Sequence, residues 1–115
     1  MTETPALWVV MPVYNEAAAI AEVINEWVTV LRTTASSFVF LVINDGSTDG
    51  TQTILENLPC PELLLVHRPN SGHGSSCLFG YRKAVEQGAT WIFQIDSDGQ
   101  CDPRFFEAFW RWRLK

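Results

Sequence analysis

Two aspartates stand two residues apart in the run Asp96-Ser97-Asp98-Gly99-Gln100, directly after the apolar stretch 91–95. In an extended backbone alternate side chains point the same way, which would bring the two carboxylates together. Close anions repel each other, and Mg²⁺ relieves such repulsion by binding one or two carboxylates together with phosphate oxygens and water. The same residue types are also common in turns. By itself, the run predicts either a metal site or an ordinary turn.

A calcium loop of the EF-hand type is excluded. Glu107 follows Asp96 by eleven residues, as the last ligand of such a loop would. However, Cys101 stands where the loop requires glycine, Pro103 interrupts it, and an apolar run precedes it where a helix should be.

Two further polar clusters follow apolar runs nearer the N-terminus. In 12–16, proline can set a turn, Tyr14 can pack on a flat base, and Glu16 can accept from a ribose hydroxyl or favour a helix start. In 44–51, Asp45 can accept hydrogen bonds from a nucleoside. One of Ser47, Thr48 and Asp49 is expected to cap the following helix.

A fourth polar cluster covers 68–74. Arg68 supplies a cation, and the glycines supply backbone that can approach a diphosphate. His73 is expected to be a loop residue and not a catalyst. Cys77 replaces the third glycine of a dinucleotide fingerprint, and the chain contains neither a P-loop nor a G-x-S-x-G motif. Nicotinamide, flavin, P-loop NTPase and α/β-hydrolase sites are therefore excluded.

The hydrophobic pattern predicts four buried strands joined by helices. The expected strands are Leu7–Met11, Phe38–Ile43, Leu63–Val66 and Trp91–Ile95. The expected helices contain Ile20–Leu31, Ile54–Leu58, Ser75 to a stop at Gly88, and a last one capped by Asp102-Pro103. The order β-α-β-α-β-α-β-α predicts an α/β fold, a parallel sheet flanked by helices. Because the carboxyl ends of parallel strands share one edge, the four polar clusters should converge there.

Composition limits the alternatives. The 115 residues predict a single domain, 1–115, and the net charge of −5 argues against nucleic acid as a partner. The sequence shows neither a signal peptide nor an apolar run near the ~20 residues that cross a bilayer, so a cytoplasmic location is expected. Cys60, Cys77 and Cys101 predict neither disulfides nor a zinc site. Trp110 and Trp112 predict apolar surface that something absent would cover, which suggests a truncated chain.

Taken together, the segments VVMPVYNE, LVINDGSTDGT, HRPNSGHGSS and WIFQIDSDGQCDP resemble glycosyltransferase family 2 in order and spacing. The resemblance implies a Rossmann-like GT-A fold, a UDP- or GDP-linked sugar donor, and Mg²⁺ or Mn²⁺. It assigns nucleotide-sugar binding to Pro12, Tyr14, Glu16, Ile43, Asp45, Asp96, Ser97 and Asp98. It assigns the metal to Asp98, which would act catalytically through it, to Asp96 and to Gln100. Asn44 departs from the family pattern, which usually has an aspartate there.

The resemblance further implies an inverting glycosyltransferase, with the dolichyl-phosphate mannose synthase and polyprenyl-phosphate sugar transferase branch most similar. This branch favours a polyprenyl phosphate acceptor at the cytosolic face of a membrane. The sequence identifies no general base, and a missing C-terminal part or membrane region is expected. Two alternatives stay open. One is a non-catalytic nucleotide-sugar-binding fragment or subunit. The other is a sugar-nucleotide pyrophosphorylase, which is disfavoured because residues 12–16 replace its glycine-rich run.

Overall fold

The computed structural model describes residues 6–35, 37–99 and 101–112, and its strands and helices alternate as the sequence predicts. The elements are β1 (Leu7–Val13), α1 (Ile20–Thr34), β2 (Phe38–Asp45), α2 (Thr51–Glu56), β3 (Leu63–Arg68), α3 (His73–Glu86), β4 (Trp91–Gln94) and α4 (Arg104–Trp112). No helix within the described ranges is long and apolar enough to span a bilayer.

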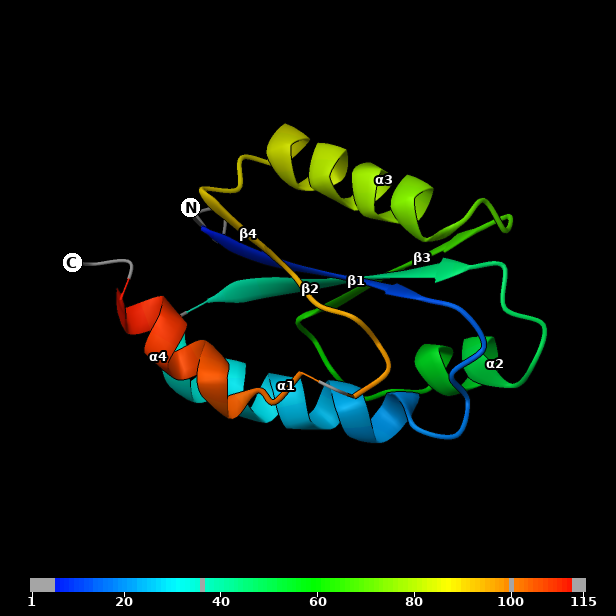
Figure 1. The fold of residues 1–115 in the computed structure, drawn as a ribbon, viewed down its shortest axis with the longest axis horizontal. Coiled ribbons are helices and arrows are strands. Elements are labelled where there is room, and N and C mark those ends of the chain that lie inside the picture. The colour runs from blue at the N-terminus through cyan, green and yellow to red at the C-terminus, as the bar shows by residue number, and fades with distance from the viewer. Residues whose placement is uncertain (1–5, 36, 100, 113–115) are drawn as a thin grey trace.

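The four strands form one parallel sheet in the order β3-β2-β1-β4. Helix α3 covers one face, and α1, α2 and α4 lie on the other (Figure 1). Successive side chains of β1 point to opposite faces of the sheet, as strand geometry requires. Leu7, Val9 and Met11 pack in the cluster that includes α1, whereas Trp8 and Val10 pack in the cluster beneath α3. This three-layer α/β arrangement confirms the predicted fold class.

The strands differ in burial because of their positions in the sheet. All of β1 and nearly all of β2 are buried, since each has a strand on both sides. The edge strands β3 and β4 are only partly covered, and Trp91 of β4 is 42% exposed. The prediction that all four strands are buried is therefore wrong for both edges. Periodicity alone does not distinguish a central strand from an apolar edge strand.

Helix α1 confirms its predicted apolar face, on which six residues are buried: Ile20, Val23, Ile24, Trp27, Val28 and Leu31. The predicted cap of α4 is also confirmed, because Asp102 Oδ1 accepts from Arg104 N at 2.9 Å. Trp110 is buried and its ring stacks on that of Phe106 at 5.8 Å, so the expectation of an exposed Trp110 is wrong. The side chain of Trp112 lies outside the described part. The exposed aromatic side chains of β4 and α4 in the described part belong to Trp91, Phe105 and Phe109.

Helix α3 approaches the sheet most closely at Gly80, where a Cβ atom would lie 2.4 Å from Val10 Cγ1 and 2.8 Å from Ile43 Cδ1. Gly80→Ala is therefore expected to push α3 from the sheet and to lower the free energy of unfolding by roughly 1–3 kcal/mol. Denaturant unfolding followed by circular dichroism measures this loss.

Gly74→Ala is the matched control, because a Cβ atom at this position of the same helix meets nothing within 4 Å. Alanine favours a helix over glycine by up to about 1 kcal/mol, so this variant should be as stable as the wild type or more so. Equal losses in both variants would contradict the close approach at Gly80.

Candidate functional site

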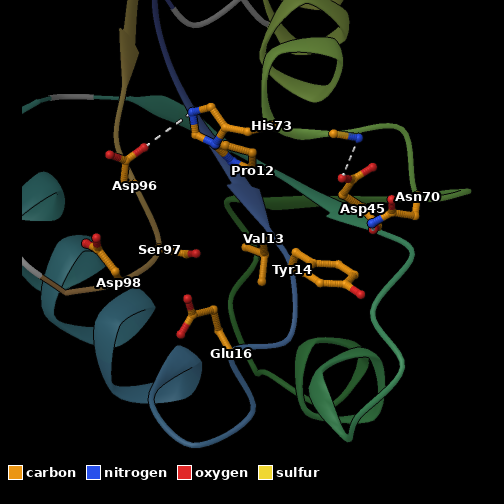
Figure 2. Close-up of a pocket in the computed structure, with 11 residues that line it drawn as sticks. Pro12, Val13, Tyr14, Glu16, Asp45, Asn70, His73, Asp96, Ser97 and Asp98 are labelled. Atoms are coloured by element: carbon orange, nitrogen blue, oxygen red, sulfur yellow. Dashed lines mark hydrogen bonds and ion pairs between the residues drawn. The ribbon is translucent and has the colours of Figure 1, made fainter.

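A cleft of about 400 Å³ opens at the carboxyl edge of the sheet. Four parts of the chain meet there: the end of β1 with the segment after it, the last residue of β2, the segment between β3 and α3, and the segment after β4 (Figure 2). The lining residues are Pro12, Val13, Tyr14, Glu16, Asp45, Asn70, Gly72, His73, Asp96, Ser97 and Asp98. The predicted convergence of the four polar clusters on one edge is confirmed.

Most of the predicted binding residues line this cleft: Pro12, Tyr14, Glu16, Asp45, Asp96, Ser97 and Asp98. Ile43 does not line it. Its side chain is fully buried in the cluster between the sheet and α3, two residues before Asp45 on β2. Gln100 lies outside the described residues, so its assignment as a metal ligand stays a prediction.

Asp96 lies between β4 and a turn, and Asp98 lies within that turn. Strand β4 ends at Gln94, and the chain turns over Ser97 and Asp98, so the extended backbone expected there is absent. The carboxylate of Asp96 is directed toward His73 (Figure 2). Its Oδ1 accepts from Gln94 Nε2 at 3.0 Å and lies 3.7 Å from His73 Nε2. Asp98 lies further along the turn, on the same wall of the cleft (Figure 2).

These carboxylates fit one class of metal ion. Within the described ranges, no three His, Cys, Asp or Glu side chains gather closely enough to hold an ion by themselves. A zinc or calcium site built from protein ligands alone needs such a group. Mg²⁺ does not, because it takes one or two carboxylates and fills its shell with substrate phosphates and water. Asp96 and Asp98 in an open cleft therefore suit Mg²⁺, or the chemically similar Mn²⁺, bound together with a phosphorylated ligand.

Asp45 is the last residue of β2, not a loop residue as expected, and it is only 3% exposed. Its Oδ1 accepts from Ser71 N (2.8 Å) and Ser71 Oγ (3.2 Å), and its Oδ2 accepts from Gly72 N (2.9 Å). Burial raises the pKa of Asp45, but the hydrogen bonds from Ser71 and Gly72 together lower it by more. The pKa therefore lies below its ordinary value. Asn70 Nδ2 also donates to the carbonyl oxygen of Asp45 at 3.0 Å. Asp45 thus fixes the segment 70–72 as one wall of the cleft.

The expected glycine backbone of the 68–74 cluster reaches the cleft at Gly72, but the expected cation does not. Arg68, the expected cation, is not among the lining residues, because it donates to Ser75 O at 3.3 Å and stacks over the Phe79 ring at 4.6 Å. Asn70 and His73 line the cleft beside Gly72. His73 is the first residue of α3, so the expectation of a loop residue is wrong. The cluster was recognisable from its composition, but the direction of each side chain depends on where the helix begins.

Asn44 is 1% exposed and does not line the cleft. Its Nδ2 lies 3.0 Å from His67 Nδ1, and its Oδ1 accepts from Ser47 N at 3.3 Å. This residue ties β2 to β3 and to the following turn. The departure from the family pattern at this position therefore leaves the composition of the cleft unchanged.

The predicted capping of α2 is only partly correct. The N-cap position belongs to Gly50, and among the described residues no side chain there caps the helix. Asp49 Oδ1 does accept from Thr51 N at 2.9 Å. Ser47 and Thr48, in contrast, form hydrogen bonds with Asn15 in the segment after β1.

Two relatives are similar to nearly the whole chain. The dolichyl-phosphate beta-glucosyltransferase ALG5C of Trichomonas vaginalis is 32% identical over 106 residues, which cover 85% of this chain and 31% of that protein. The glycosyltransferase AglJ of Haloferax volcanii is 35% identical over 101 residues, which cover 86% of this chain and 29% of that protein. The chain therefore spans about a third of the length of these relatives.

The solved structure of the mannosyltransferase PcManGT from Pyrobaculum calidifontis, in complex with GDP-Man and Mn²⁺, has a similar fold, with a TM-score of 0.61 and 26% identity. The similarity covers 72% of this chain and 25% of that chain. The family model for glycosyl transferase family 2 matches residues 8–112. With the parallel sheet and the cleft at its carboxyl edge, these matches show that the chain belongs to glycosyl transferase family 2 and has its Rossmann-like GT-A fold.

Proposed function

We propose that the protein takes part in the inverting transfer of a sugar from a nucleoside-diphosphate sugar to a polyprenyl phosphate, with this chain binding the donor. The observation that carries the proposal is the cleft, where Asp96 and Asp98 face residues suited to a nucleoside. Ligands of open parallel sheets bind at this edge. The GDP-Man and Mn²⁺ bound to the similar mannosyltransferase structure support the same combination of donor and metal.

In this proposal Asp98 and Asp96 hold Mg²⁺ or Mn²⁺, with Gln100 as a further predicted ligand. The ion would neutralise negative charge that builds on the departing diphosphate. Tyr14 is half exposed at the cleft, so its ring is free to pack on the base. Glu16 accepts from the ribose hydroxyls.

Asp45 would contact the nucleoside through the hydrogen-bonding capacity that remains on its carboxylate. A carboxylate can accept about four hydrogen bonds. Ser71 and Gly72 supply three of them, two on Oδ1 and one on Oδ2. An N–H group of the base could therefore be accepted by Oδ2 without loss of the wall formed by 70–72. Pro12 and Ser97 complete the cleft around the donor.

A phosphate acceptor agrees with the lack of an identified general base among the lining residues. A phosphate monoester with a second pKa of about 6 is already largely ionised at neutral pH, so it needs little deprotonation before it attacks. A hydroxyl acceptor would need a base. The name of the Trichomonas relative, a dolichyl-phosphate glucosyltransferase, supports this class of acceptor.

Calorimetric titration of the 115-residue chain with GDP and with UDP, each with and without Mn²⁺, tests donor binding. We expect one nucleotide to bind, and to bind more tightly with Mn²⁺. If neither nucleotide binds under any of these conditions, the proposed function is wrong.

Transfer is tested separately, with labelled GDP-mannose or UDP-glucose and dolichyl phosphate, by the movement of label into the organic phase. Transfer would support the full proposal. Nucleotide binding without transfer would favour the non-catalytic alternative.

A further inference from the structure

Two loops that lie far apart in the sequence are held together beside the cleft. Residues 15–17 follow β1, and residues 47–51 lead into α2. Three consecutive backbone amides of the first segment donate to side chains of the second: Asn15 N to Ser47 Oγ (3.0 Å), Glu16 N to Thr51 Oγ1 (2.9 Å) and Ala17 N to Asp49 Oδ2 (3.2 Å). We call these two segments and the hydrogen bonds between them the loop clamp.

Thr51 is the buried centre of the loop clamp. Its side chain is fully buried, although it is polar. The hydroxyl accepts from Glu16 N and donates to Asp49 Oδ1 at 2.5 Å, so it is satisfied both as acceptor and as donor. Asp49 in turn accepts from Ala17 N. Removal of the hydroxyl would leave Glu16 N without its acceptor, whereas Asp49 would keep the hydrogen bonds from Ala17 N and Thr51 N.

Asn15 is the residue that bends the first segment. With a φ of 50°, it is the non-glycine residue with positive φ in the described part of the chain. Asparagine adopts this conformation more readily than most residues, but it still costs free energy. The cost is offset by pairing with Thr48, since Asn15 Oδ1 accepts from Thr48 N at 2.7 Å and Asn15 Nδ2 donates to Thr48 Oγ1 at 3.2 Å.

The bent segment carries two residues of the cleft. Tyr14 and Glu16 flank Asn15 and both line the cleft (Figure 2). The hydroxyl of Thr51 accepts from the backbone amide of Glu16, although no residue of α2 lines the cleft. The position of the Glu16 carboxylate thus depends on a hydroxyl that cannot itself reach a ligand, because it is buried.

We propose that Thr51 and Asn15 are positioning residues that set Tyr14 and Glu16 for the nucleoside of the donor. This assignment rests on the proposed function. It gives the Ser47-to-Thr51 run a role in ligand binding through the neighbouring loop, in addition to its place at the start of α2. Placement of binding groups before the ligand arrives increases affinity, because less ordering remains to be done on binding.

Thr51→Val tests the proposal because it keeps the side-chain shape and removes the hydroxyl. We expect the dissociation constant for the nucleotide in the presence of Mn²⁺ to rise about tenfold, the effect of losing one or two net hydrogen bonds. Thr51→Ser should restore binding to within about twofold of the wild type, since it keeps the hydroxyl. Thr53→Val is the control, because Thr53 is exposed on the same helix. Calorimetric titration measures all four proteins.

Asn15→Gly provides an independent test if Thr51→Val fails to fold. Glycine accepts the positive φ but removes both side-chain bonds to Thr48. We expect weaker nucleotide binding and faster amide exchange at Glu16 and Ala17. The free energy of unfolding of Asn15→Gly should be closer to the wild-type value than that of Asn15→Ala, because alanine does not accept the positive φ as readily.

The two proposals fail in different ways. A wild type that binds no nucleotide overturns the proposed function, and the positioning role with it. A wild type that binds, together with Thr51→Val and Asn15→Gly variants that bind equally well, overturns the positioning role alone. Failure of Thr51→Ser to restore binding would also contradict it, because the hydroxyl would then not be the group that matters.

Discussion

The Asp98→Asn variant is expected to lose the joint effect of Mn²⁺ and nucleotide on the melting temperature. An amide at this position can still coordinate weakly, but it lacks the charge that a hard cation requires. A ligand at 100 times its dissociation constant stabilises by about 2.7 kcal/mol, which corresponds to roughly 10–20 °C for a domain of this size. We expect Mn²⁺ and nucleotide together to raise the melting temperature of the wild type by this amount. For Asp98→Asn, Mn²⁺ should add almost nothing to the shift that nucleotide alone produces. Thermal unfolding followed by tryptophan fluorescence measures it.

Glu22→Gln is the matched control, because Glu22 is an exposed acid in the first turn of α1 and does not line the cleft. It should keep the full shift. Asp96→Asn should also reduce the shift, because Asp96 is the second carboxylate proposed to hold the metal. If Asp98→Asn retains the joint effect, the assignment of Asp98 as the principal metal ligand is wrong.

The sequence was sufficient to predict the architecture and the location of the site. Apolar runs of strand length alternate with helical patterns, and this order admits few arrangements other than a parallel sheet with crossovers. The shared carboxyl edge then follows from the topology. For this reason the sequence alone predicts one shared cleft for three residues that are far apart in the chain, Tyr14, Asp45 and Asp98.

What the sequence could not predict is the direction in which individual polar side chains point. Arg68 and His73 belong to the same cluster, yet Arg68 stacks on Phe79 and His73 lines the cleft. The difference arises because α3 begins at His73, two residues before the expected start. Helix boundaries are set by tertiary contacts as much as by local residue preference. In the same way, Thr48 was one of three candidates for the cap of α2, whereas in the structure it pairs with Asn15.

Asp45→Ala is expected to be among the most destabilising single substitutions in the cleft. It removes the buried carboxylate that accepts from the amides of Ser71 and Gly72. Hydrogen bonds to a charged group contribute about 1.5–3 kcal/mol each and are not additive, so a loss of about 3 kcal/mol in the free energy of unfolding is expected. Asp45→Asn should lose less, because its oxygen can still accept from Ser71 while its amide group faces Gly72 N–H. Urea unfolding at pH 7 measures both variants.

The dependence on pH separates the charge of Asp45 from its shape. Its pKa lies below the ordinary value of 3.8, so the folded chain holds the ionised form more strongly than the unfolded chain does. The stabilisation is therefore complete above that value and is lost as the pH falls through the lower, folded-state pKa. The difference between wild type and Asp45→Asn should be constant from neutral pH down to about pH 5 and should shrink below about pH 4. Glu86→Gln, which changes an exposed acid on α3 outside the cleft, is the control. A difference that persists unchanged in acid would mean that segment 70–72 is held by the shape of residue 45, and not by its charge.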